Sequence, residues 1–373
     1  MTTLSRRAWL HRSALAAAAL PLSRFPLSVK ESHSSRPAGD DAYIRLNSNE
    51  NAYGPSDAAR TAVLESLEDA NRYPRHYYQK LIEQIAEREG VSTDCILITA
   101  GSSEILGLVG LTYGIEGGQV LACQPTFDFA LRYAERLGCT WSRTPLDQNY
   151  HYNLGALAEE AGPDTRMVFI CNPNNPTGVE SPYTELRAFC VHQSRRYPVF
   201  IDEAYIEFSS RGRTNSLADM AAQTPNVVVS RTFSKIHGLA GLRIGYAIAH
   251  PSTIALLKNY HTGRGVTVSN AGAAAASACL SDPEFESFCR KKIVQGRELV
   301  CMAFDGWGVE YMKSATSFVC FRNDKFSMKP REAMEKERIL IRDYDDFPGW
   351  SRVSIGTVDE MKTFIEAAKK YVG

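Results

Sequence analysis

One lysine in the sequence lies among residue types that could make it a nucleophile. Lys235 follows the apolar run 227–229 and two hydroxyl residues, Thr232 and Ser234, and a glycine-bearing turn leads from it to Arg243. Two hydroxyls and a guanidinium suit a phosphate, and a lysine that is desolvated or lies near a cation has a lowered pKa and reacts as an amine. Alone, this stretch could also be a solvated loop. With the stretches below, it predicts a phosphate site beside a reactive amine.

Two other stretches offer groups for an anion. The sequence AGSSEI (100–105) predicts a strand that turns into a helix, where free backbone N–H groups and the hydroxyls of Ser102 and Ser103 suit a phosphate. In NPNNPTG (172–178) two prolines stiffen a loop that presents the amides of Asn174 and Asn175. By themselves, the first stretch could be an ordinary helix cap and the second a sharp turn.

A carboxylate completes the set. Asp202 follows the apolar run 198–201, with Tyr205 three residues later, and a carboxylate at the carboxyl end of a buried strand faces a ligand in the crevice of a parallel sheet. Helix capping is the alternative role for Asp202. Together the stretches provide an amine, an acid, a phenol, an amide and two phosphate-binding segments. Pyridoxal phosphate requires this set, because it needs a lysine for its aldehyde, a carboxylate at its ring nitrogen, and donors to its phenolate oxygen and phosphate.

The apolar runs predict the elements that hold these groups. Short continuous apolar runs belong to strands buried on both faces, so the expected fold class is α/β, with a mostly parallel central sheet flanked by helices. The expected strands are 94–101, 119–125, 166–173, 198–205, 226–232 and 243–249, followed by 316–322, 338–344 and 351–356 in a smaller α+β part. A long helical stretch is expected from about residue 251 to near residue 280.

Nearly everything after residue 43 resembles a fold-type I, class I/II aminotransferase that depends on pyridoxal phosphate, and most of all the histidinol-phosphate aminotransferase group. The motifs that carry the resemblance, in the order of the family, are LNSNENAYGPS (46–56), RYPR (72–75), AGSSEIL (100–106), QPTFDFA (124–130), CNPNNPTG (171–178), DEAYIEF (202–208), RTFSKIHGLAGLRIGYA (231–247), ILIRD (339–343) and RVSIGT (352–357). The resemblance implies the fold of type I transferases, with a large cofactor-binding domain and a smaller one.

The resemblance also implies a role for each matching residue. The catalytic residues would be Lys235, which binds the aldehyde of the cofactor, Asp202, which keeps the pyridine nitrogen protonated, and Tyr205. The cofactor-binding residues would be Ser102, Ser103, Phe127, Asn175, Asp202, Tyr205, Thr232, Ser234, Lys235, Arg243 and, from a second subunit, Tyr73. The substrate-binding residues would be Tyr53, Asn175, Arg342 and Arg352. No metal ligand is implied.

The implied activity is transfer of an amino group between an amino acid, or an amino-alcohol phosphate, and a 2-oxo acid. A lyase, decarboxylase or oxidase that uses the same cofactor on an amino acid is the alternative. A regulator that merely kept the fold is disfavoured because Lys235 and Asp202 are both present. Ser317, where the family usually carries asparagine, and the segment 263–272 depart from the family and leave the substrate open.

The expected partners are the small-molecule donor and acceptor and a second copy of the chain, which would form a homodimer. The 42 basic and 42 acidic residues leave no basic excess for a nucleic acid. The sequence also shows no apolar run of the ~20 residues that span a membrane.

The first forty residues predict a leader rather than part of the fold. Arg6 and Arg7 precede the uncharged, alanine-rich run 13–22, a pattern typical of a twin-arginine export signal. We therefore expect a periplasmic or secreted protein, or a cytoplasmic one if the leader does not function. The predicted organisation is a leader (1–40), an N-terminal arm (41–55), a large pyridoxal-phosphate-binding domain (56–250) and a small C-terminal domain (251–373).

Overall fold

The computed structural model describes residues 43–262 and 267–373, which belong to one compact unit, 35–373. The predicted leader lies outside the described residues. The predicted division into a large and a small domain stays a prediction, but the described residues do form two hydrophobic cores that can be compared with it.

A central sheet holds the first core. Within the described residues it has seven strands, in the order β2–β10–β9–β8–β7–β3–β5. Their bounds are β2 (Ile96–Thr99), β3 (Gly118–Leu121), β5 (Cys139–Trp141), β7 (Thr165–Cys171), β8 (Val199–Asp202), β9 (Val227–Thr232) and β10 (Gly245–Ala249). The strands from β9 to β5 are parallel to their neighbours, and β10 is antiparallel to both β2 and β9. The predicted mostly parallel sheet is thus confirmed.

The segment 119–125, expected as one strand, is divided. Residues after β3 leave the central sheet and form β4 (Cys123–Gln124), which pairs with β6 (Thr144–Pro145). Pro125 then ends β4, because a proline has no N–H to continue a ladder.

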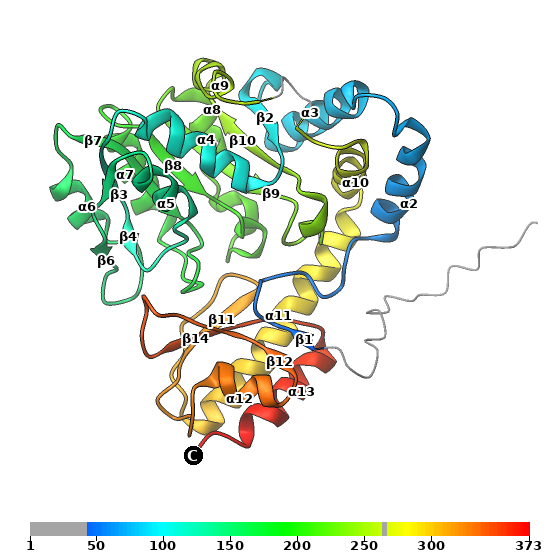
Figure 1. The fold of residues 1–373 in the computed structure, drawn as a ribbon, viewed down its shortest axis with the longest axis vertical. Coiled ribbons are helices and arrows are strands. Elements are labelled where there is room, and N and C mark those ends of the chain that lie inside the picture. Colours follow the sequence, from blue (N-terminus) through cyan, green and yellow to red (C-terminus); the bar gives the residue numbers. More distant parts are fainter. Residues whose placement is uncertain (1–42, 263–266) are drawn as a thin grey trace, which may run out of the picture. The chain divides into compact units, whose positions relative to one another are not determined.

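Helices cover the sheet and connect its strands (Figure 1). Their bounds are α2 (Asp57–Glu65), α3 (Arg75–Glu89), α4 (Ser102–Gly114), α5 (Phe129–Glu135), α6 (Leu154–Glu160), α7 (Tyr183–Gln193), α8 (Ala218–Gln223), α9 (Pro251–Lys258) and α10 (Asn270–Leu280). Helix α4 begins directly after β2 and packs against β9, β10 and α5. This packing fixes the N-terminal end of α4 beside the carboxyl end of β9.

The expected long helix between residues 251 and 280 is wrong. Two helices, α9 and α10, occupy this stretch, and α10 has its own cap, because the Ser269 side chain accepts the N–H of Gly272. Buried residues of both helices, such as Leu257 and Ala275, belong to the first core. The packing therefore joins both helices to the sheet rather than to the smaller part of the chain.

The second core is built from the C-terminal elements and the start of the arm. Its elements are α11 (Pro283–Trp307), β11 (Phe318–Arg322), α12 (Pro330–Lys336), β12 (Ile339–Leu340), β13 (Arg342–Asp343), β14 (Trp350–Ser354), α13 (Val358–Lys369) and β1 (Ile44–Arg45). Strand β1 pairs with β12, so the arm is anchored to this core before it continues toward the sheet. Tyr205 and Ile236, which flank the predicted site, also pack in the second core.

Candidate active site

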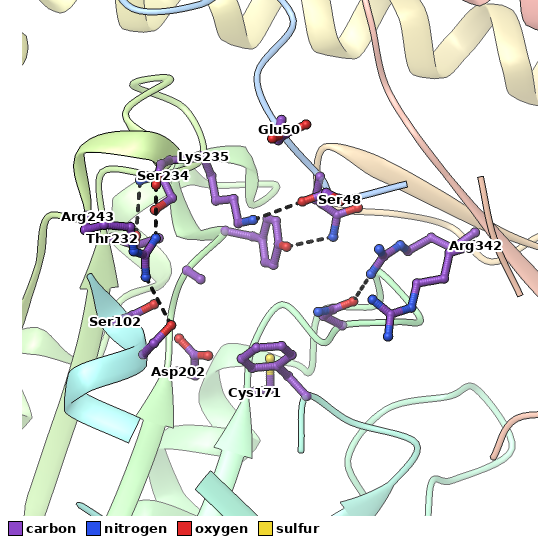
Figure 2. Close-up of a pocket in the computed structure, with 18 residues that line it drawn as sticks. Ser48, Glu50, Ser102, Cys171, Asp202, Thr232, Ser234, Lys235, Arg243 and Arg342 are labelled. Atoms are coloured by element: carbon purple, nitrogen blue, oxygen red, sulfur yellow. Dashed lines mark hydrogen bonds between the residues drawn. The ribbon is translucent and has the colours of Figure 1, made fainter. Parts of the chain in front are cut away.

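The site is a pocket of about 330 Å³ at the carboxyl ends of the parallel strands. It is lined by Ser48, Asn49, Glu50, Ser102, Ser103, Phe127, Cys171, Asn175, Asp202, Ala204, Tyr205, Thr232, Ser234, Lys235, Ala240, Arg243, Arg342 and Arg352. Figure 2 shows Arg243, Thr232 and Ser234 gathered near Ser102 at one end, and Arg342 at the opposite end. The pocket thus has two ends of different chemistry, with Lys235 and Asp202 between them.

The first end is a cradle of N–H groups, hydroxyls and one guanidinium. The Arg243 Nη2 donates to Ser103 Oγ over 3.2 Å, and the backbone N–H of Ser234 donates to Thr232 Oγ1 over 3.1 Å. Arg243 adopts a left-handed backbone with φ of 54°. Such backbone is rare outside glycine and concentrates at ligand-binding positions.

A glycine makes the cradle possible. Gly101 has φ of +76°, and a Cβ there would lie 2.4 Å from Nη2 of Arg243. The guanidinium therefore occupies space that any other residue at position 101 would take. With the N-terminus of α4 beside it, the arrangement suits a dianionic phosphate.

Lys235 brings a partly buried amine to the middle of the pocket. Its Nζ lies 3.5 Å from the carbonyl oxygen of Ser48 and 5.6 Å from the centre of the Tyr205 ring. Burial, with a smaller effect from Arg352, lowers the pKa of Lys235 to about 8, although Asp202 acts in the opposite direction. A substantial fraction of the amine is therefore neutral and nucleophilic near neutral pH.

Asp202 is the last residue of β8, Tyr205 follows the strand, and both are buried. Burial raises the pKa of Asp202 to about 6, and the hydrogen bond that Ser230 Oγ donates over 2.8 Å opposes this rise. Burial also raises the pKa of Tyr205, whose hydroxyl accepts a hydrogen bond from Asn49 Nδ2 over 2.8 Å. Asp202 is thus a carboxylate that burial destabilises, and a cationic partner would stabilise it.

The second end of the pocket is formed by two arginines. Arg352 is 3% exposed, and it donates from Nη1 to Asn175 Oδ1 and from Nη2 to the carbonyl of Asn47 over 2.8 Å. Its Nε is buried and has no hydrogen-bond partner among the described residues. Arg342 is exposed and lines the same pocket. Planar guanidinium groups suit a carboxylate or phosphate.

The chain is similar over most of its length to known proteins. Residues 41–367 match the family described as aminotransferase class I and II. Histidinol-phosphate aminotransferase 1 of Dechloromonas aromatica is 35% identical, over 88% of this chain and 89% of that protein. Histidinol-phosphate aminotransferase of Brevibacillus brevis is 32% identical, over 88% and 90%. The chain belongs to the class I and II aminotransferase family.

A solved structure confirms the fold. The histidinol-phosphate aminotransferase of Sinorhizobium meliloti, in complex with pyridoxal 5′-phosphate, superposes with a TM-score of 0.82 at 25% identity, covering 88% of this chain and 90% of that one. The predicted fold type I architecture and the predicted pyridoxal-phosphate-dependent aminotransferase are confirmed. The cradle at Gly101, which leaves room for Arg243, and the partly buried amine of Lys235 fit this cofactor.

Most predicted site residues of this aminotransferase lie together, but two do not reach the pocket of the single chain. The Tyr53 ring packs against Phe288 at 5.3 Å between ring centres, and its hydroxyl accepts the N–H of Val358 over 3.2 Å. Tyr73 is 76% exposed and is not among the residues that line the pocket. Their predicted roles remain predictions.

Several lining residues were missed by the sequence reasoning. Ser48, Asn49 and Glu50 come from the arm, within the motif 46–56 that carried the resemblance, so the motif was a usable signal. Ser230 was also missed. It lies directly opposite Asp202 in the register of β8 and β9, and this pairing could have been found only by aligning the two apolar runs.

Two kinds of feature are absent from the described ranges, 43–262 and 267–373. No helix in these ranges is long and apolar enough to cross a membrane. The same ranges contain no group of three or more His, Cys, Asp or Glu residues placed to hold a metal ion.

Proposed function

We propose that this aminotransferase moves the amino group of an anionic donor, an amino acid or an amino-alcohol phosphate, to a 2-oxo acid, with Lys235 as its reactive amine. The observation that carries the proposal is the position of this amine. Its Nζ is partly buried, has a pKa lowered to about 8, and lies between the cradle at Arg243 and the two arginines of the second end. Each end offers guanidinium groups, so one would hold the cofactor phosphate and the other a substrate anion.

The residues that would hold the cofactor follow from their places in the pocket. When bound, pyridoxal phosphate supplies an aldehyde that joins an amine covalently and a ring that withdraws electrons from the donor's α-carbon. Asp202 would face the ring nitrogen, and Tyr205 and Asn175 would contact the 3-oxygen. Phe127 would stack on the ring. The phosphate would be held by Ser102, Ser103, Thr232, Ser234 and Arg243.

Lys235 has two tasks in the proposed reaction. As a neutral amine, its Nζ would hold the cofactor covalently. With the donor bound, the same Nζ would accept the proton from the donor's α-carbon. A base with a pKa near the working pH is suited to this transfer. The Asp202 carboxylate supports the step electrostatically, because a negative charge beside the ring nitrogen stabilises the positive charge there.

Arg352 would bind the α-carboxylate of an amino acid or another anionic group of the substrate. The hydrogen bonds to Asn175 and to the carbonyl of Asn47 hold its guanidinium in place before the substrate arrives. A preoriented group loses less entropy when it binds. The names of the relatives suggest histidinol phosphate as one donor, and its phosphate ester would suit the same arginines.

A donor panel tests the proposal. The purified protein, loaded with pyridoxal phosphate, is mixed with histidinol phosphate, glutamate and neutral amino acids, first without and then with an oxo acid. The oxo acid is 2-oxoglutarate for every donor except glutamate, for which it is oxaloacetate, so that each pair can form a new amino acid. We expect the cofactor absorbance to shift with an anionic donor and to return when the oxo acid is added, with stoichiometric formation of a new amino acid. Release of ammonia, carbon dioxide or peroxide without any dependence on an oxo acid would instead support a lyase, decarboxylase or oxidase.

We propose that the protein is a homodimer in which Tyr73 reaches the phosphate site of the second subunit. Support comes from the exposure of three large side chains within one stretch of ten residues, since Leu64, Leu67 and Tyr73 are 67%, 57% and 76% exposed. Large apolar side chains exposed in a monomer are candidates for an interface. Light scattering should give twice the chain mass. A fully active monomer would contradict the proposal.

We also propose that residues 1–40 direct export by the twin-arginine route. The support is the pair Arg6–Arg7 before an uncharged run. Cell fractionation should find the protein in the periplasm or the medium, and Arg6→Lys with Arg7→Lys should retain it in the cytoplasm. An unchanged distribution of the double variant would contradict the proposal.

A further inference from the structure

Two arginines of the pocket lie directly opposite one another in the small sheet. Arg342 of β13 and Arg352 of β14 are register partners in an antiparallel pair. Like charges at such positions repel and destabilise the pairing. A compensating contact is therefore expected close to this pair.

Tyr344 supplies this contact. The centre of its ring lies 5.4 Å from Cζ of Arg342 and 5.6 Å from Cζ of Arg352. The negative face of an aromatic ring attracts a guanidinium at such distances. One ring thus contacts both cations and sets where they lie relative to each other.

The side chains of the two arginines differ in how many contacts hold them. Arg352 has two hydrogen bonds from its guanidinium, and the Phe318 ring lies 5.1 Å from its Cζ. Arg342 is exposed, and within the part of the chain that the structure describes its side chain makes no hydrogen bond or ion pair. Arg342 is therefore a cation held by Tyr344 alone and available to a ligand.

A side pocket lies next to these residues. Its volume is about 140 Å³, and it shares Phe127, Asn175 and both arginines with the main pocket. Three arginines and two aspartates line it, and one pair of these, Arg132 and Asp128, forms an ion pair. The remaining charges are predominantly positive, so the side pocket favours an anion. A site of this size holds roughly the volume of five waters at ~30 Å³ each, which limits the occupant to a compact group.

The hydroxyl of Tyr344 has no partner. It is buried and forms no hydrogen bond among the described residues, although Tyr344 lines the side pocket. Burial raises the pKa of Tyr344 to about 12, while the two arginines act in the opposite direction, so the phenol remains a neutral donor. Buried hydroxyls without a partner are costly and uncommon. A ligand acceptor in the side pocket would supply the missing hydrogen bond.

We infer that Tyr344 determines specificity for the distal group of the substrate. Its ring fixes the spacing of Arg342 and Arg352, and its hydroxyl donates to a compact anion, a carboxylate or a phosphate monoester, seated in the side pocket. The inference rests on the proposed function, because it concerns the substrate of the same site. Tyr344 acts by contact with this distal group and takes no part in proton transfer.

Equilibrium binding tests the inference without turnover. The cofactor-loaded protein is titrated calorimetrically with succinate in one arm and inorganic phosphate in the other. Tyr344→Phe removes the hydroxyl and keeps the ring, so the affinity for the preferred anion should fall about threefold to tenfold, the range for one lost hydrogen bond. Tyr344→Leu also removes the ring and should weaken binding further. Tyr150→Phe, a change in a partly buried tyrosine that packs on Trp350 outside both pockets, is the matched control and should leave the affinity unchanged.

Steady-state kinetics with two donors distinguish a change in substrate specificity from a general loss of activity. The ratio of kcat/KM for an anionic donor, such as glutamate, to that for a neutral donor should fall in both Tyr344 variants and stay constant in Tyr150→Phe. Equal losses for both donors, or unchanged anion affinity in Tyr344→Leu, would overturn the inference. If the unaltered protein transfers no amino group, the proposed function fails, while the titrations still decide whether Tyr344 binds an anion.

Discussion

The two faces of strand β9 differ in how far their charged side chains are compensated by opposite charges. Side chains alternate along a strand, so Ser230 and Thr232 face the pocket while Arg231 faces away from it. Arg231 is 1% exposed and lies within 3.0 Å of Glu203, 3.4 Å of Glu207 and 3.5 Å of Glu89. Its positive charge is surrounded by carboxylates.

The pocket face lacks this compensation. Burial lowers the pKa of Lys235 to about 8 and raises that of Asp202 to about 6, so each group is displaced toward its neutral form. On the far face, the carboxylates raise the pKa of Arg231 above its usual value, and Arg231 and Arg213 hold the pKa of Glu89 below its usual value. Burial still raises the pKa of Glu203 and raises that of Glu207 to about 7, so the compensation is complete for the arginine and for Glu89 only. The comparison indicates that the ion pairs of Arg231 stabilise the ends of β8 and β9. Lys235 and Asp202 lack a full set of charged partners, and we expect the cofactor and the substrate to supply them.

The largest effect is expected from removing the amine of the pocket face. Lys235→Ala should lower kcat by at least about 10²–10⁴-fold, the contribution of a positioned general base, and the protein should lose the absorbance of the covalently bound cofactor. Turnover and the visible spectrum are measured after reconstitution. Lys369→Ala, which changes an exposed lysine at the end of α13, is the control and should retain both. An active Lys235→Ala protein without added amine would remove Lys235 from its proposed role.

The second prediction contrasts activity with stability at Asp202. Asp202→Asn should lower kcat by ~10²–10³-fold, because the electrostatic support of the ring nitrogen is lost. The cofactor-free variant should nevertheless be the more stable protein near pH 7.5. The pKa of Asp202 is raised from 3.8 to about 6 in the folded state. The folded protein therefore binds the proton more tightly than the unfolded chain, and its stability falls as the pH rises between these values.

Denaturant unfolding at pH 3.5 and pH 7.5 measures this effect. The full shift corresponds to about 3 kcal/mol, an order-of-magnitude value for a buried group. The unaltered protein and Asp202→Asn should differ by a comparable amount at the higher pH and by little at the lower pH. A variant that is less stable at pH 7.5 would show that Asp202 is already well compensated, and would undermine the contrast between the two faces.

The third prediction concerns the far face. Arg231→Met leaves buried carboxylates without their cation and should lower the free energy of unfolding by about 3–5 kcal/mol. Activity per folded molecule should change far less than for Lys235→Ala. Arg187→Met removes an arginine that pairs with Asp219 at the surface, and this control should cost at most about 1 kcal/mol. Equal losses in the two variants would mean that the Arg231 cluster contributes no more than a surface pair.

The elements that position the site were largely predictable from the sequence, for a physical reason. Strands such as β7 and β9 are buried on both faces, so their apolar runs are continuous and easily recognised. The residues at their carboxyl ends, including Asp202 and Lys235, could be assigned to one pocket because parallel strands end at the same edge. The break between α9 and α10 was not predictable, because an alanine-rich pattern such as that of α10 fits one helix or two.

The remaining site residues depend on contacts between distant parts of the chain. Asn49 reaches Tyr205 only because its backbone N–H donates to Ser354 Oγ, 305 residues away, over 2.8 Å. Tyr344 resembles any aromatic residue after a strand until β13 and β14 pair and bring two arginines to its ring. No local pattern encodes such pairings. They follow from how the second core anchors both the arm and the small sheet.

The smallest expected effect tests how tightly the cradle is built. Gly101→Ala places a Cβ 2.4 Å from Nη2 of Arg243 at a backbone φ of +76°, so both the backbone and the guanidinium must shift. Affinity for pyridoxal phosphate should fall about tenfold, as expected when one charge-assisted hydrogen bond is weakened, and fluorescence titration of the cofactor-free protein measures it. Gly306→Ala, in α11 with nothing within 4 Å of the added Cβ, is the matched control and should leave the affinity unchanged. The guanidinium of Arg243 is the cation that lines the phosphate end, and it can lie there because residue 101 has no Cβ. Unchanged affinity in Gly101→Ala would therefore mean that the hydroxyls and the N-terminus of α4 hold the phosphate without Arg243. In that case phosphate binding on the pocket face would depend on backbone dipoles rather than on the charge of Arg243.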